Sequence, residues 1–406
     1  MFRDLGRVTR VLQRDLDAIE IGQSRGTGVL AVEYEGMLDD TLLSAAFDLL
    51  CKKYRVLCGR VKTESGRHIL YVSPEYRPAF LCANGDFDTL QKELNTPFTR
   101  EDAVARLLLI RNGDSGFAGL RLNHAIIDGG SGIPIIADLW DIYTRLVNGE
   151  KVQVDDVEVR GLPKPPTELI KKYWPGEDVG ALRGSTVDDD SRPYVEVHKP
   201  RIRLTEEETN DVKTIARMNG VSLHGILFGS IILALRSKGI VSELEPVICV
   251  SPVDMRDRVD PTVESFETSN FFAVHMCSIF ANAADDALSI GRRVINDLHE
   301  SIENCKLVWP VSSTGDANRT DSVIIACSNI GALSSFSEPE SLVIKDFLTL
   351  TGNQVDHPVN ARVYAHSSNT YKGRLCLQGS YRSCWQTLEE TNSIFELIRH
   401  ELTSIC

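Results

Sequence analysis

The hexapeptide HAIIDG, from His124 to Gly129, joins an apolar, strand-like run to a glycine-rich turn. A neutral imidazole, with an ordinary pKa of about 6.5, can take the proton of a hydroxyl or an amine as that group attacks a thioester carbonyl, which is worth roughly 100- to 10,000-fold in rate. Asp128 either orients the imidazole, as in a catalytic triad, or holds the loop by pairing with an arginine, and the spacing leaves both roles open. Because a chance HxxxDG arises in roughly a few per cent of chains of this length, its context matters.

Other residues that could do chemistry lack the spacing that their chemistry needs. The sequence contains no GxSxG nucleophile motif and no phosphate-binding glycine loop, so the glycines after Asp128 are interpreted as clearance for a substrate. The ten cysteines form no CxxC pair. Four histidines show no metal-ligand spacing: His275, His299, His357 and His366. We therefore expect no metal and no permanently bound cofactor.

The pattern around the hexapeptide predicts alternating strands and helices. Residues 112–116, Asn-Gly-Asp-Ser-Gly, are a hairpin signal between two apolar runs. We predict strands over 28–35, 56–61, 68–72, 105–111 and 117–122, and helices over 39–54 and from Ser131 or Gly132 to the stop at Asn148-Gly149. The strand that ends at Asn123 would thus present His124 at a strand–turn–helix junction, where rigid scaffolds often hold reactive groups.

The second half of the chain repeats this α/β character. Thr205 and Glu208 form a capping box for a helix over 206–218, and a very apolar, buried helix follows over 223–235. We predict strands over 194–204, 247–250, 274–280, 322–328 and 375–378, and helices over 284–305 and 386–403. A proline- and glycine-rich stretch separates the halves, so we expect an N-terminal half over 1–160, a linker over 161–193 and a C-terminal half over 194–406.

Composition fits a globular protein of two domains. The chain has 406 residues, of which 42% are hydrophobic and 25% charged. A net charge of −13 argues against a nucleic-acid partner. No apolar run is long enough for a membrane span, and the unpaired cysteines fit a reducing, cytoplasmic compartment. We also expect a monomer.

HxxxDG, here preceded by Asn123, resembles the HHxxxDG signature of the superfamily that contains chloramphenicol acetyltransferase, condensation domains and polyketide-associated acyltransferases. The likeness is closest to the phthiocerol dimycocerosyl transferase type and extends along nearly the whole chain. The similar blocks are LLSAAFDLLCKKYRVLCGR from Leu42 to Arg60, the apolar helix from Ser222 to Leu235, SPVDMR from Ser251 to Arg256, and SNFF from Ser269 to Phe272.

The resemblance implies two similar chloramphenicol acetyltransferase-like α/β halves, with mixed sheets flanked by helices, arranged as a V around a central channel. It also implies that Asp128 is structural and pairs with Arg256, beside Gly129. Ser328 or Asn329 is then a candidate donor to the tetrahedral oxyanion, a contact worth about 3 to 4 kcal/mol. The candidates for lining the channel are Asn123, Gly130, Asn270, Ser328 and Asn329.

The function implied is transfer of an acyl group from coenzyme A or a carrier-protein phosphopantetheine to an alcohol, without an acyl-enzyme, in lipid, polyketide or other secondary metabolism. His124 would be the general base. One alternative is a free-standing condensation-type enzyme that acylates an amine to form an amide. Another is a noncatalytic module that uses the same fold to hold an acyl carrier protein. The motif does not separate the first two readings, and an intact His124, Asp128 and Gly129 argue against the third.

Overall fold

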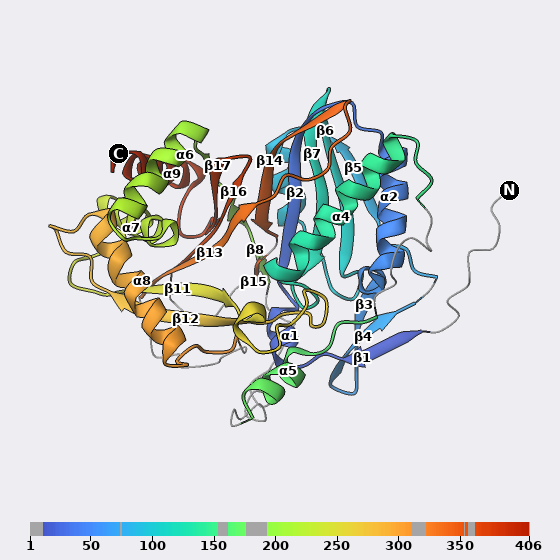
Figure 1. The fold of residues 1–406 in the computed structure, drawn as a ribbon, viewed down its shortest axis with the longest axis horizontal. Helices are drawn as coiled ribbons and strands as arrows, with labels where there is room; N and C mark the ends of the chain where they lie inside the picture. Colours follow the sequence, from blue (N-terminus) through green and yellow to red (C-terminus); the bar gives the residue numbers. More distant parts are fainter. Residues whose placement is uncertain are drawn as a thin grey trace.

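The computed structural model describes residues 11–73, 75–152, 161–175, 193–310, 322–352, 354–355 and 362–405. Two lobes lie side by side, each built on one large sheet with helices packed against it (Figure 1). In the described part of the chain no single helix is long and apolar enough to cross a membrane. Among the described helices one pair, α6 (Glu206–Met218) and α7 (Leu223–Ser237), reaches that length and hydropathy together, and the two are bent by 104°.

The N-terminal lobe holds a five-stranded sheet in the order β14-β2-β7-β6-β5, in which β14 is Leu342–Thr351 and, of the four pairings, only that of β5 with β6 is parallel. A small sheet, β1-β4-β3, lies beside it. The elements are β1 (Leu12–Asp15), α1 (Ala18–Gln23), β2 (Thr27–Gly36), α2 (Asp40–Lys53), β3 (Gly59–Glu64), β4 (Arg67–Val72), β5 (Phe80–Asn84), α3 (Phe87–Asn95), β6 (Ala105–Asn112), β7 (Ser115–Asn123), α4 (Gly129–Val147) and α5 (Pro166–Tyr173).

The C-terminal lobe holds the order β10-β17-β16-β13-β11-β12, with β13 parallel to both of its neighbours. The second half of the chain contains the following elements, of which β14 belongs to the N-terminal sheet: β8 (Tyr194–Val195), β9 (Val197–His198), β10 (Arg201–Arg203), α6 (Glu206–Met218), α7 (Leu223–Ser237), β11 (Val247–Asp254), β12 (Phe272–Ile279), α8 (Ala287–Glu303), β13 (Val323–Leu333), β14 (Leu342–Thr351), β15 (Gln354–Val355), β16 (Arg362–Tyr371), β17 (Arg374–Arg382) and α9 (Leu388–Thr403).

The two halves share a pattern, which confirms the expected mixed α/β fold. In each half an antiparallel hairpin, β6–β7 or β16–β17, has a parallel neighbour on its first strand, β5 or β13. In each half the second hairpin strand leads through a turn into a helix, α4 or α9. The V shape and the channel remain predictions.

The division into halves is crossed by one strand. β14 comes late in the chain but pairs with β2 along its length, from Leu342 opposite Gly36 to Thr351 opposite Gly28. The apolar core under α2 and α4 accordingly includes Phe336 and Phe347. A second large core lies under α6, α7 and α9. The N-terminal sheet is therefore complete only with residues from beyond the linker.

Several predicted bounds need correction. Residues 55–58 form a 3-10 helix before β3, because Val56 and Leu57 are apolar in succession and both pack into the core. The strand predicted over 194–204 is three short strands, with breaks at Glu196 and at Lys199-Pro200, and Pro200 has no N–H to donate to a ladder. The expected linker includes α5 within 161–175, and its remaining residues up to 192 lie outside the described residues.

Candidate active site

His124 follows the last residue of β7 and is held there by backbone bonds. Its N–H donates to the Gly26 carbonyl at 2.9 Å. The side chain of Asn123 donates to the Ser24 carbonyl at 2.7 Å and accepts from the Ala125 N–H at 2.9 Å. Asn123, at the position where the family signature has its first histidine, is thus buried, and its side chain ties the strand end to Ser24, the C-cap of α1.

The other half of the molecule fixes the same turn. Asn270, just before β12, donates its side-chain amide to the carbonyls of His124 at 2.8 Å and Ala125 at 3.1 Å. The His124 ring lies 6.2 Å from the ring of Phe272, centroid to centroid. The imidazole is half-buried, and its Nδ1 is buried with no hydrogen-bond partner among the described residues, which leaves Nε2 as the accessible nitrogen. A group with an accessible ring nitrogen on a fixed backbone is suited to proton transfer.

Asp128 is the N-cap of α4, and both of its carboxylate oxygens are engaged. Oδ1 accepts from the Ser131 N–H at 3.0 Å, in a capping box, while Oδ2 accepts from Arg256 Nη1 at 2.9 Å and from the Phe271 N–H at 2.8 Å. Asp128 is 8% exposed and Arg256 4%. Burial by itself lowers the pKa of Arg256, but Asp128 and Asp254 outweigh it and raise that pKa above its ordinary value. The structure thus brings Asp128 together with Arg256, and no described bond joins it to the His124 ring.

The glycines after Asp128 have different surroundings. A Cβ on Gly130 would lie 2.4 Å from Asp254 Oδ2 and 2.6 Å from Arg256 Nη1, whereas a Cβ on Gly129 would meet nothing within 4 Å. Gly130 therefore permits the close approach of the helix start to the buried ion pair, instead of lining open space. Gly129 is exposed.

Sequence reasoning missed a buried network under this turn. Ser269 donates its hydroxyl to Glu20 Oε1 at 2.5 Å, and its carbonyl accepts from Ser131 Oγ at 3.3 Å and Arg256 Nη2 at 3.5 Å. Burial raises the pKa of Glu20, although Arg14, paired with it at 2.6 Å, acts in the opposite direction. The signal was present in the sequence as a capping box, since Glu20 stands three residues after Asp17 at the start of α1.

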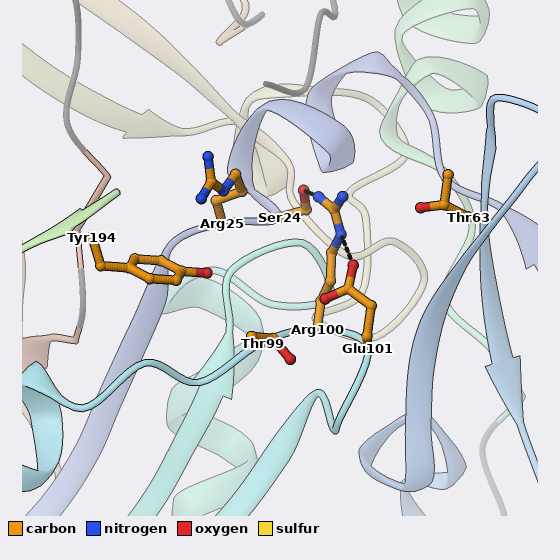
Figure 2. A pocket seen from close by; sticks show the side chains of 7 residues that line it. All are labelled: Ser24, Arg25, Thr63, Thr99, Arg100, Glu101 and Tyr194. Carbon is orange, nitrogen blue, oxygen red and sulfur yellow. Dashed lines mark hydrogen bonds and ion pairs between the residues drawn. The ribbon is translucent and has the colours of Figure 1, made fainter. Parts of the chain in front are cut away.

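A pocket of about 470 Å³ lies beside the segment that holds His124 (Figure 2). Ser24, whose carbonyl accepts from the Asn123 side chain, is one of its lining residues. Arg25 is another, and its guanidinium carbon lies 5.2 Å from the centre of the Tyr194 ring. Arg100, also in its wall, bonds to Glu101 and to the Ser24 hydroxyl. The lining residues are Ser24, Arg25, Thr63, Thr99, Arg100, Glu101 and Tyr194. The size suits part of a small-molecule substrate.

Ser328 and Asn329 lie in β13, half-buried, where the β13–β16 register shifts after Asn329. The Asn329 side-chain oxygen accepts from the Gly331 N–H at 3.0 Å, which leaves its amide nitrogen as a donor. Among the described residues no contact joins either side chain to His124. The two residues therefore remain candidates for the oxyanion contact.

Comparison with known sequences supports the resemblance. A family described as phthiocerol/phthiodiolone dimycocerosyl transferase C-terminus matches residues 193–380. A phthiocerol/phthiodiolone dimycocerosyl transferase of Mycobacterium leprae (strain TN) is 21% identical, over 93% of this chain and 92% of that protein. Its counterpart from Mycobacterium ulcerans (strain Agy99) is 23% identical, over 85% of this chain and 86% of that protein.

Comparison with solved structures supports the fold. Polyketide synthase associated protein 5 from Mycobacterium tuberculosis has a TM-score of 0.74 at 18% identity, with 97% of both chains covered. A trichothecene 15-O-acetyltransferase from Fusarium sporotrichioides has 0.68 at 14%, over 99% of this chain and 96% of that chain. The first condensation domain of the CDA synthetase has 0.67 at 12%, over 96% and 95%. The resemblance seen in the sequence is confirmed: this chain is similar over most of its length to phthiocerol/phthiodiolone dimycocerosyl transferases, and it shares the fold of polyketide synthase associated protein 5 and of a condensation domain.

Proposed function

We propose that this protein transfers an acyl group from a thioester, carried by coenzyme A or by the phosphopantetheine of a carrier protein, to a hydroxyl, forming an ester. The observation that carries the proposal is the placement of His124, whose accessible Nε2 stands on a turn fixed from both halves by Gly26 and Asn270. The relatives are named as transferases, and one structural neighbour as an O-acetyltransferase, which supports an O-acyltransferase.

The chemistry needs one base. Nε2 of His124 takes the proton of the acceptor hydroxyl as its oxygen bonds to the thioester carbonyl carbon. The tetrahedral intermediate then loses the C–S bond, and the imidazolium returns its proton to the departing thiolate. No acyl-enzyme is required. Asp128 is a positioning residue, because its oxygens are engaged by Arg256 and backbone N–H groups.

The pocket beside Ser24 offers an entry for the donor. Arg25 and Arg100 supply two positive charges to its wall against one from Glu101, which suits a phosphate-bearing thioester. Ser24 in the pocket wall accepts from the Asn123 side chain, and Gly26 accepts from the His124 N–H, which is why we place the donor entry on this side of the turn. Ser328 and Asn329 are the proposed donors to the oxyanion.

The test is release of free thiol from a panel of acyl-CoA donors and acyl-loaded carrier proteins, with alcohols and amines as acceptors. His124→Ala is compared with the native chain and with His299→Ala, an exposed histidine of α8. Acceptor-dependent release should fall at least about 100-fold in His124→Ala and stay unchanged in His299→Ala.

The same assay separates the alternatives. Release that requires an amine and yields an amide would favour the condensation-type reading, for which the structural likeness to a condensation domain is the reason to test it. Release that survives in His124→Ala would contradict the assigned base. No release with any donor would favour the noncatalytic module that binds a carrier protein.

A further inference from the structure

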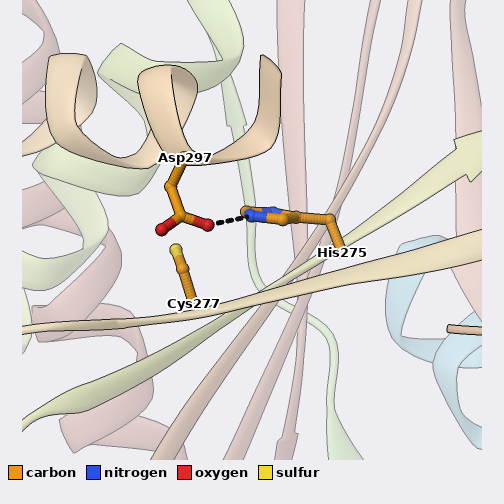
Figure 3. A group of neighbouring side chains, drawn as sticks. All are labelled: His275, Cys277 and Asp297. Atoms are coloured by element: carbon orange, nitrogen blue, oxygen red, sulfur yellow. Dashed lines mark hydrogen bonds and ion pairs between the residues drawn. The ribbon is translucent and has the colours of Figure 1, made fainter. Parts of the chain in front are cut away.

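Three metal-ligating side chains meet between β12 and α8. His275 and Cys277 are two residues apart on β12, so they lie on the same face of the strand, and both are buried. Asp297 reaches them from α8, with its Oδ1 2.8 Å from His275 Nε2 (Figure 3). One ligand atom from each residue lies within 4.8 Å of the other two. The cluster uses none of the residues of the candidate active site.

The three ligand types suit zinc. Zn²⁺ binds imidazole nitrogen and carboxylate oxygen at about 2.0–2.2 Å and thiolate sulfur at about 2.3 Å, so its tetrahedral ligands lie roughly 3–4 Å from one another. The observed spacing needs only small side-chain adjustments to reach that range. A mixed set of nitrogen, sulfur and oxygen donors favours zinc over magnesium or calcium, which prefer oxygen alone.

Burial also distinguishes this cluster from an ordinary surface pair. His275 is 1% exposed, and its Nδ1 is buried without a hydrogen-bond partner among the described residues, so Asp297 is the one group that holds the ring. The Asp297 side chain is 50% exposed, which gives an ion a route from solvent and leaves room for a water molecule as the fourth ligand.

We propose that His275, Cys277 and Asp297 bind one Zn²⁺ ion, which links β12 to α8. The ion bonds to His275 Nε2, Cys277 Sγ and an Asp297 carboxylate oxygen, and the thiol proton of Cys277 passes to solvent on binding. β12 is the edge strand of its sheet and begins just after Asn270 and Phe271, the residues that hold the His124 turn. The metal thus stabilises β12, and with it the position of Asn270 and Phe271, through which the C-terminal half contacts the candidate site.

The test uses the full chain, stripped of metal with a chelator and kept reduced with a phosphine, because Cys249 lies opposite Cys277 in the β11–β12 ladder and a disulfide between them would remove the ligand. Zn²⁺ is titrated by calorimetry, and Co²⁺ is added separately to read the thiolate-to-cobalt absorption band. Asp297→Asn and Cys277→Ser are compared with Cys384→Ser, an exposed cysteine elsewhere.

We expect one Zn²⁺ per native chain, a melting temperature raised by Zn²⁺, and a cobalt–thiolate band. The affinity should be at least about tenfold weaker in Asp297→Asn, since even outer-sphere partners of a metal are worth about 10- to 100-fold. The band should vanish in Cys277→Ser and persist in Cys384→Ser. The proposal is overturned if the native chain shows no cobalt–thiolate band, which needs no variant to fold, or if Asp297→Asn binds Zn²⁺ as tightly as the native chain.

Discussion

The two halves of the molecule each contain a strand–turn–helix junction, and the two junctions differ in what their caps contact. The β7–α4 junction is capped by Asp128, whose second oxygen crosses to Arg256 and Phe271 of the other half. The β17–α9 junction is capped by Thr387, in an exposed capping box with Glu390 whose bonds within the described part of the chain are local. A carboxylate has acceptor capacity left after capping and can join two lobes, so the junction that is tied across the molecule is the one that carries His124.

The largest predicted effect is on stability, and it differs between the removal of the Asp128 cap and the removal of the Thr387 cap. Asp128→Ala removes the cap and leaves the Arg256 guanidinium buried with only Asp254 beside it, so the free energy of unfolding should fall by about 3 to 5 kcal/mol. Thr387→Ala loses a local cap alone and should cost about 1 kcal/mol. Urea unfolding of both variants measures the difference. Asp128→Asn keeps a capping side chain without the charge and should fall between them. Equal losses for Asp128→Ala and Thr387→Ala would show that the tie across the lobes contributes nothing.

A second difference concerns histidine burial in the two hairpins. His124 is half-buried, whereas His366 of β16 is 5% exposed, bonds to the Tyr381 hydroxyl at 2.9 Å, and has its pKa lowered to about 4 by burial. Below about pH 6.5 the unfolded chain takes up a proton at this histidine and the folded chain does not. The stability from His366 is therefore fully present above about pH 6.5 and is lost as the pH falls toward 4, by up to roughly 3 kcal/mol.

The measurement is the free energy of unfolding at several pH values between 7 and 4.5. The loss on acidification should be smaller in His366→Gln than in the native chain, even though the variant is less stable at pH 7. His299→Gln, at an exposed position, should leave the pH dependence as it is. Parallel pH curves for the native chain and His366→Gln would contradict a neutral, buried His366.

The smallest predicted effect tests how closely α4 approaches the ion pair. Gly130→Ala places a Cβ against Arg256 and Asp254, and we expect a loss of about 1 to 3 kcal/mol from overpacking. Gly129→Ala, one residue earlier and facing open space, should change stability by less than about 1 kcal/mol. Thermal unfolding of the two variants is the check. If Gly129→Ala lost as much stability as Gly130→Ala, the loss would come from backbone strain and not from contact of the new Cβ with Arg256 and Asp254.

Elements with a strong local pattern could be predicted from the sequence. The hairpin β6–β7, the capped helices α2 and α6, and the apolar helix α7 appear close to their expected bounds, since turn residues, caps and apolar spacing act locally. β14 and β16 were missed, and β14 is specified by its pairing with β2, far away in the chain. Likewise β11 continues through Asp254 because β12 pairs with it that far, which its own residues do not signal.

The residues of the candidate site likewise divide into those that a sequence motif indicates and those that only the tertiary fold brings together. The pairing of Asp128 with Arg256 was anticipated from the resemblance, and the class of O-acyltransferase is borne out by the named relatives. The role of His124 as general base stays a prediction. Glu20 and Ser269 were not anticipated, because their contact joins residues 249 apart. The neighbours of His275 were missed for a related reason, since Asp297 meets it by the packing of α8 on β12 and not by any spacing along one element.

The path of β14 also constrains how the polypeptide can be divided. A fragment that ended in the linker would keep β2 but lose β14, which pairs with β2 from Gly28 to Gly36. Such a fragment presents a long, largely buried strand as an open edge, the kind of surface on which chains add to one another and aggregate. We therefore expect the N-terminal half not to fold by itself, and in ribosomal synthesis its sheet can be completed only after β14, late in the chain, has been made.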